Sequence, residues 1–117
     1  MHEFSNENEI LIVRISGVVD QDDASALASK VHSWLDAARN GARMLVDASE
    51  LHIYSPQGAD LLLGFMKKAN PKLERAAFIA PASQTAALQL ARLIREAGGN
   101  NRRVFADREE ARRWLTE

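Results

Sequence analysis

The chain has 117 residues, of which 46% are hydrophobic and 26% charged, and its formal net charge is −1, so we expect one globular domain over residues 1–117. Its lack of cysteine excludes disulfides, zinc–thiolate sites, iron–sulfur clusters and thiol nucleophiles. We expect a cytoplasmic protein, because no apolar run approaches the roughly 20 residues of a membrane span and the amino end lacks the features of a signal peptide.

The first elements of the chain have clear periodic patterns. Residues 9–15 are rich in β-branched residues and apolar on both alternating faces, which predicts a strand covered on both sides. Residues 3–5 are expected to pair with this strand. Apolar residues then recur at helical spacing over 24–38, which predicts a helix that Asn40 and Gly41 close with a left-handed cap.

Strands and helices continue to alternate along the rest of the chain. The expected elements are a strand at 43–47, a loop and then a helix at 56–69, a strand at 76–80, a helix at 83–97, a strand at 102–105 and a last helix after Asp107. Strands separated by helices of this length pair in parallel through crossover connections. We therefore predict an α/β domain with a mixed, mostly parallel β-sheet of four or five strands, about four helices and an antiparallel strand at the amino end.

Arginine is frequent near the carboxyl end, which raises the question of a nucleic-acid site. Residues 92–113 also contain several acids, and Glu109 lies four residues before Arg113, as on a solvated helix face with ion pairs. We therefore expect no binding of nucleic acid.

Residues 46–63 predict a strand, a loop and the start of a helix, which is a natural position for a functional site. Free N–H groups at a helix amino end attract anions, so a phosphate on Ser55 would be stabilised there. A structural interpretation competes, because serine is a favoured N-cap and Pro56 suits the first helical position. Ser55 is the phosphorylation candidate, and the residues by themselves favour the helix cap.

Three segments carry a resemblance to a known family. Residues 15–24 look like the strand-end pattern Gly-Glu-Leu-Asp-x-x-x-Ala, residues 45–58 look like a strand, a loop and an Asp-Ser-Ser-Gly helix start, and residues 104–115 look like a terminal strand and helix. In these features the chain resembles the STAS family of sporulation-type anti-sigma-factor antagonists and sulfate-transporter tails. The resemblance implies a non-enzymatic domain, without cofactor or metal, that binds another protein of a kinase-like or regulatory kind.

The chain also departs from the family pattern. Aligned through Gly58, the phosphorylated serine of the family falls on Pro56, while Ser55 falls on the preceding aspartate and Gln57 on the second serine. Because proline cannot be phosphorylated, a partner switch requires Ser55 to take the role one residue early. The family glutamate after glycine is Val18 here, which removes a polar contact. These departures indicate a divergent branch of unassigned function.

The predicted partner surface combines residues 51–56, the helix start through Asp60 and the adjacent turn at 20–23. Its expected residues are Asp20, Asp22, Asp23, His52, Tyr54, Ser55, Gln57, Gly58 and Asp60. Asp22 and Asp23 have a structural explanation as well, since acids in the first turn of a helix are favoured by its dipole.

The helix after Pro56 supports an alternative function. Leu61 and Phe65 widen its apolar stripe to more than half of the circumference. Packed core, a dimer partner, a ligand or a membrane surface would each cover the excess. The alternative is a small apolar-ligand or lipid-binding domain, similar to CRAL-TRIO domains, that uses Leu61, Phe65 and Met66. A homodimer is a further possibility for the same face.

Two catalytic interpretations lack residues that they require. A hydrolase would combine Ser55 and His52 with Asp47 or Asp60, but the chain has no Gly-x-Ser-x-Gly elbow. A phosphorylated-aspartate receiver built on Asp47 would need a lysine after the last strand, and residues 104–107 contain none. We therefore predict no enzyme activity and name no catalytic residue.

Overall fold

Five strands form one sheet in the computed structural model, which describes residues 2–38 and 41–117. The elements are β1 (His2–Glu7), β2 (Ile10–Val19), α1 (Gln21–Ala37), β3 (Ala42–Tyr54), α2 (Pro56–Ala69), β4 (Leu73–Ile79), α3 (Gln84–Ala97), β5 (Arg102–Phe105) and α4 (Arg108–Thr116). The strands lie in sequence order, with β1 antiparallel to β2 and every other pair parallel. This mixed sheet with four helices confirms the predicted fold class.

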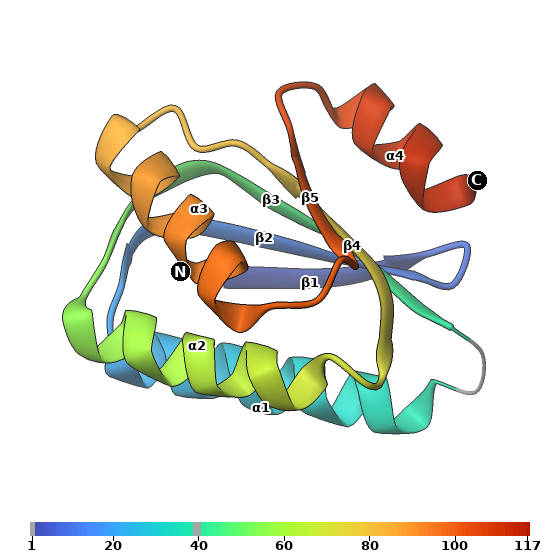
Figure 1. Cartoon of the computed structure of the whole chain (residues 1–117), viewed down its shortest axis with the longest axis horizontal. Coiled ribbons are helices and arrows are strands. Elements are labelled where there is room, and N and C mark those ends of the chain that lie inside the picture. The colour runs from blue at the N-terminus through green and yellow to red at the C-terminus, as the bar shows by residue number, and fades with distance from the viewer. Residues whose placement is uncertain (1, 39–40) are drawn as a thin grey trace.

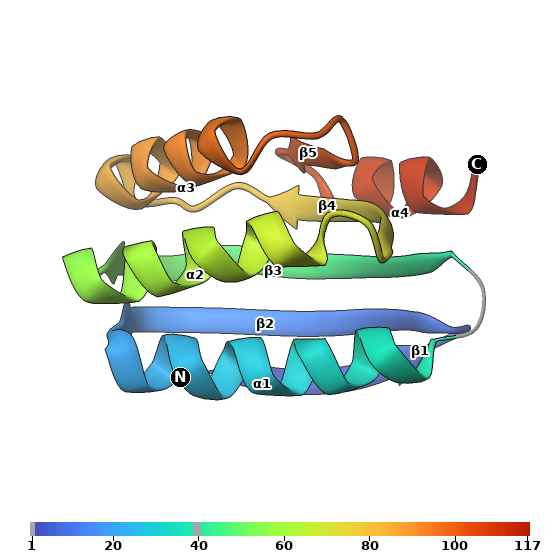
Figure 2. The same ribbon diagram turned by 60° about the horizontal axis from the view of Figure 1, so that its bottom comes forward.

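The helices are divided between the two faces of the sheet (Figures 1 and 2). Successive right-handed crossovers between neighbouring strands place α1, α2 and α3 on one face, and α4 packs on the other. The alternation along β2 divides the core accordingly. Val13 and Ile15 belong to the large cluster beneath α1–α3, whereas Ile12 belongs to a smaller cluster with Ala111 and Leu115 of α4.

The strand β3 is longer than the sequence predicted. Residues 48–54 were expected to form a loop, and the structure shows them as strand, so that expectation is wrong. The pairing of β3 with β2 is shifted between Arg14 and Ser16 and again between Gly17 and Val18. Bulges of this kind break the two-residue period by which a strand is recognised in a sequence. The paired part of β4 ends opposite Asp47, so the rest of β3 is paired with β2 alone.

The helix bounds follow local signals that the sequence shows. The helix α2 has the predicted bounds, and Ser83 forms the N-cap of α3. The helix α1 ends with Ala38 as its C-cap, whereas the predicted cap residue Asn40 lies outside the described residues. None of the described helices is long and apolar enough to cross a membrane.

Two arginines of the sheet hold the carboxyl end of α4. Arg75 donates a hydrogen bond to the carbonyl oxygen of Trp114, and Arg43 donates one to that of Leu115. The guanidinium of Arg75 also lies 5.1 Å from the ring centroid of Trp114. Positive charge is favourable at the carboxyl end of a helix. The small apolar face of α4 is therefore supplemented by charged contacts.

Candidate functional site

Two turns lie side by side at the carboxyl ends of β2 and β3. They follow Val19 and Tyr54, which are register partners on these neighbouring parallel strands. The backbone N–H of Ser55 donates to the carbonyl oxygen of Val19 over 2.9 Å, which joins the two turns. Gly58 packs against the same backbone, where an added Cβ would lie 2.6 Å from the Val19 oxygen. The segments that the sequence singled out at 20–23 and 51–60 therefore meet.

Side-chain caps begin the helix after each turn. An Asp20 carboxylate oxygen accepts a hydrogen bond from the N–H of Asp23 at 2.9 Å, and the Ser55 hydroxyl accepts one from Gly58 at 3.0 Å. Ser55 has the extended backbone of an N-cap, and Pro56 opens the helix. Ser55 thus has the structural role that the sequence favoured. Its phosphorylation stays a prediction.

Two residues of the predicted partner surface are buried. The Tyr54 side chain is 3% exposed and points into the core beneath the helices, where burial raises the pKa of its hydroxyl above the ordinary value. Gly58 is buried by the close packing of α2 on the β2–α1 turn. These two residues therefore shape the surface from beneath, and a partner would not reach the Tyr54 side chain.

The accessible part of this end of the molecule combines carboxylates with two apolar side chains. Val18 and Ile53 are cross-strand partners with 54% and 37% of their surface exposed. We call the accessible set the strand-end surface: Val18, Asp20, Asp22, Asp23, His52, Ile53, Ser55, Gln57 and Asp60. The sequence placed Ile53 within the predicted range 51–56 and noted Val18 only as the loss of a polar contact, but it did not identify either residue as an exposed apolar contact of this surface. The sequence does show two β-branched residues beside a turn. Because bulges interrupt the strand period, however, it does not predict that these two side chains face outward.

The helix α3 holds the end of β3 in place. The Gln89 side chain accepts a hydrogen bond from the N–H of Tyr54 at 2.9 Å and donates one to its carbonyl oxygen at 3.0 Å. The Ser83 hydroxyl donates to the carbonyl oxygen of His52 at 3.0 Å. These contacts replace the pairing that β4 does not supply. The strand-end surface therefore rests on a backbone fixed from both sides.

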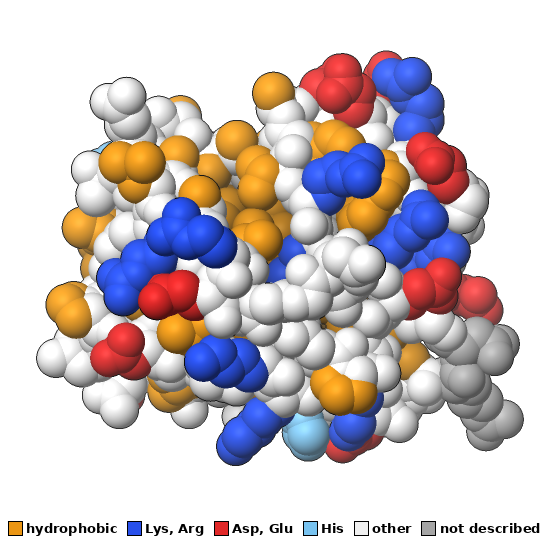
Figure 3. All heavy atoms as spheres, in the orientation of Figure 1, with side chains coloured by type: hydrophobic (Ala, Val, Ile, Leu, Met, Phe, Trp, Pro, Cys, Tyr) orange, Lys and Arg blue, Asp and Glu red, His pale blue; other side chains and the backbone are white. Residues whose placement is uncertain are grey.

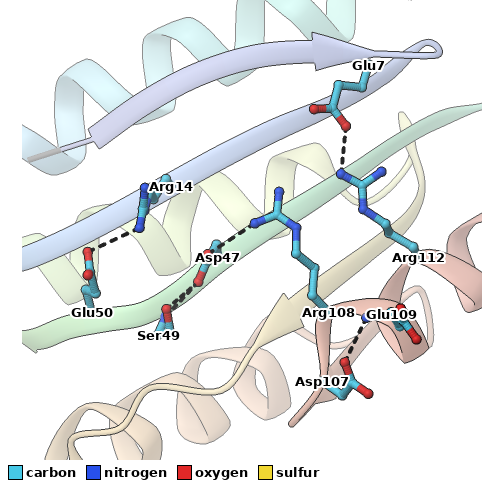
Figure 4. A network of polar contacts seen from close by, with 9 residues as sticks. All are labelled: Glu7, Arg14, Asp47, Ser49, Glu50, Asp107, Arg108, Glu109 and Arg112. Atoms are coloured by element: carbon cyan, nitrogen blue, oxygen red, sulfur yellow. Dashed lines mark hydrogen bonds and ion pairs between the residues drawn. The ribbon is translucent and has the colours of Figure 1, made fainter.

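Asp47 lies away from the strand-end surface, on the sheet face that α4 partly covers (Figure 4). Its carboxylate accepts hydrogen bonds from the hydroxyl and N–H of Ser49 at 2.7 and 3.0 Å, and it lies 3.5 Å from Arg108. Burial acts to raise the pKa of Asp47, but the Ser49 bonds and the charges of Arg108 and Arg14 outweigh it, so the pKa is below its ordinary value. Asp47 thus has structural partners for its charge.

Within the described residues, no group of three or more histidine, aspartate or glutamate side chains could hold a metal ion. None of the hydrogen bonds or ion pairs there links Ser55, His52 and an aspartate side chain as a hydrolase triad would.

The residues of the apolar-ligand alternative pack into the core. Phe65 and Met66 line a partly open cavity of about 70 Å³ between the sheet and α1–α3, and Leu61 is partly buried against the core cluster. An apolar cavity of about 150 Å³ holds a molecule the size of benzene. A lipid would therefore require the helices to move apart, and the apolar-ligand function stays a prediction.

Comparison with known proteins agrees with this architecture. The family model described as SpoIIAA-like matches residues 10–116. The chain belongs to the SpoIIAA-like family. This family assignment confirms the sequence resemblance to the anti-sigma-factor-antagonist fold. No curated protein matches the sequence.

Three solved structures show how closely SpoIIAA-like folds agree with this one. An uncharacterised protein of Shewanella loihica PV-4 with a SpoIIAA-like fold has a TM-score of 0.74 at 20% identity, covering 98% of this chain and 92% of its own. The anti-sigma factor antagonist SpoIIAA in its unphosphorylated form has a TM-score of 0.71 at 15% identity, and the match covers 99% of this chain and 98% of SpoIIAA. An anti-sigma factor antagonist of Mycobacterium paratuberculosis has a TM-score of 0.68 at 13% identity, and the match covers 100% of this chain and 94% of that protein. At these identities the likeness concerns the fold.

Proposed function

We propose that this SpoIIAA-like chain is a non-enzymatic, cytoplasmic regulatory domain that binds a protein partner through the strand-end surface. The main support for this proposal is that Val18 and Ile53 are exposed side by side, on a backbone that hydrogen bonds of Ser55 and Gln89 hold in place. Exposed apolar side chains surrounded by polar groups are typical of protein interaction sites. Similarity in fold to anti-sigma factor antagonists supports a partner of a kinase-like or regulatory kind.

Ser55 is the residue through which we propose that the interaction is regulated. Ser55 is partly exposed, and its hydroxyl lies at the amino end of α2, where backbone N–H groups and the helix dipole stabilise added negative charge. A phosphate there would add about two negative charges within the strand-end surface. Partner affinity would then depend on the phosphorylation state, even though proline occupies the usual acceptor position.

Two substitutions at Ser55 test this proposal. Ser55→Asp keeps a capping side chain and adds charge, so we expect it to change the amount of partner retained by tagged protein from its own cell extract. Ser55→Ala removes the cap, which costs about 1 kcal/mol of stability, together with the phosphate acceptor, and is expected to retain the partner as the unphosphorylated wild type does. Quantitative mass spectrometry of the retained proteins measures both effects.

Equal retention by all three forms would contradict the switch, and no retained partner in any form would contradict the proposed function. Native mass spectrometry of the gently isolated protein adds an independent measurement, because a phosphate-sized mass increment mapped to Ser55 would support regulation at this residue. The same spectrum reports a retained apolar ligand or a second subunit.

A further inference from the structure

The strand-end surface has charge of one sign. Residues 15–29, 48–66 and 76–91 hold the ends of β2, β3 and β4 and the first turns of α1–α3, and they contain no lysine or arginine. The first range contains three acids and the second contains two. Of these five, Glu50 is paired with Arg14 at 3.6 Å. The other four, Asp20, Asp22, Asp23 and Asp60, have no ion-pair partner within the described residues.

The helix dipoles do not cancel this negative charge. Three helix amino ends lie at the strand ends, and each contributes about half a positive charge, or roughly 1.5 charges together. Four unpaired carboxylates exceed that sum. Around α4, in contrast, arginines are interspersed with acids, and positive and negative side chains alternate at the upper right of Figure 3. An excess of unpaired carboxylates therefore distinguishes the strand-end surface from the surface around α4.

One unpaired carboxylate adjoins the exposed apolar pair, and the other three lie near the starts of α1 and α2, the helices that follow the same two turns. Asp20 follows Val18 by two residues, and the turn that carries Asp20 is bonded to the turn after Ile53. We infer that the strand-end surface binds a basic segment of its protein partner. In this complex an apolar side chain of the segment packs on Val18 and Ile53, and flanking lysines or arginines of the segment face the four aspartates. This inference rests on the proposed function and adds the chemistry of the partner. Attraction between complementary charges mainly accelerates association, and salt weakens this attraction. The apolar contact mainly slows dissociation.

A defined probe tests the inference without the natural partner. The probe is a synthetic hexapeptide that alternates lysine and leucine, and its control is the counterpart that alternates glutamate and leucine. Titration of each into the full chain is followed by NMR of backbone amides. We expect the lysine peptide to shift the amides of Val18, Asp20 and Ile53, with a Kd that rises with salt, and the glutamate peptide to cause no such shifts.

Matched variants separate the contributions to binding. The double variant Asp22→Asn with Asp60→Asn is expected to raise the Kd of the lysine peptide about threefold or more, as removal of two exposed charge pairs would. Val18→Ser should raise the Kd at low and high salt alike. Glu109→Gln with Glu110→Gln removes two exposed acids of α4 and should leave the Kd unchanged.

Three results would overturn the inference: shifts centred on α4, equal binding of the glutamate peptide, or a Kd that responds to the α4 variant as strongly as to the aspartate variant. Val18→Ser with an unchanged Kd would refute the apolar contact. If the lysine peptide fails while cell extract yields a Ser55-dependent partner, the charge inference falls and the proposed function stands. Absence of any cellular partner would instead overturn the proposed function.

Discussion

Gly58 and Gly64 occupy the same helix in opposite surroundings. An added Cβ on Gly58 would lie 2.6 Å from the carbonyl oxygen of Val19 and 2.9 Å from that of Asp20, whereas one on Gly64 would meet nothing within 4 Å. The close approach at Gly58 lets Ser55 bond across the two turns. At the residue scale, the strand-end surface therefore depends on the absence of a side chain beneath it.

We expect Gly58→Ala to destabilise the fold by about 1–3 kcal/mol, because the methyl group would push α2 away from the β2–α1 turn. Gly64→Ala is the matched control and should stabilise the protein by about 0.5–1 kcal/mol, since alanine is the better helix former. Urea unfolding of both variants measures the difference. A Gly58→Ala protein as stable as the Gly64→Ala protein would show that the turn adjusts at little cost.

At the scale of elements, α4 is attached to the sheet largely through charged groups. Arg108 lies 3.5 Å from Asp47, and Arg112 pairs with Glu7 at 2.6 Å. Arg43 and Arg75 of the sheet hold the carboxyl end of α4. Together these contacts orient a short helix that has few buried residues. The sequence signals that predicted α4, an acidic cap and an apolar pair, are local and do not indicate which face of the sheet it covers.

Stability is expected to depend on the protonation of Asp47. Its pKa is lower in the folded chain than the value of about 4 in an unfolded one. The folded state therefore gains stability from Asp47 above pH about 4, and this gain is lost as the pH falls through the folded pKa. Asp47→Asn should reduce the pH dependence of the free energy of unfolding between pH about 6 and 3. An NMR titration of the Asp47 carboxyl carbon provides the direct check, and a midpoint at or above 4 would contradict it.

At the scale of the whole molecule, three helices and the sheet line a partly open cavity of about 70 Å³. Phe65 lies on its wall, partly buried in the main core cluster. The wide apolar stripe of α2 is therefore covered largely within the chain itself. This packing bears on the apolar-ligand alternative, in which Phe65 would contact a ligand.

We expect Phe65→Ser to lower the free energy of unfolding by about 2–4 kcal/mol, because the ring packs in the core. Leu88→Ser is the control, since Leu88 is 71% exposed on α3 and should change stability by less than about 0.5 kcal/mol. Chemical unfolding monitored by circular dichroism measures both. A Phe65→Ser protein of wild-type stability that loses a bound apolar molecule would instead support the ligand-binding alternative.

Much of the element order could be predicted because its signals are local. The Ser55–Pro56 start of α2, the Ser83 cap of α3 and the β-branched run of β2 each act within a few residues. The end of β3 could not be predicted in this way. Its bulges disturb the strand period, and its hydrogen bonds come partly from Gln89, whose position in the sequence gives no hint of the contact.

The amino-acid sequence by itself determined the α/β class, the resemblance to the SpoIIAA-like fold and the two segments that form the candidate site. These follow from periodicity, helix caps and short motifs, which operate over neighbouring residues. Only the tertiary structure decided that Tyr54 faces the core while Val18 and Ile53 face outward, and that four aspartates at this end lack ion-pair partners within the described residues. The physical reason is that side-chain direction after a bulge, and the pairing of charges, depend on segments distant in sequence that meet only on folding.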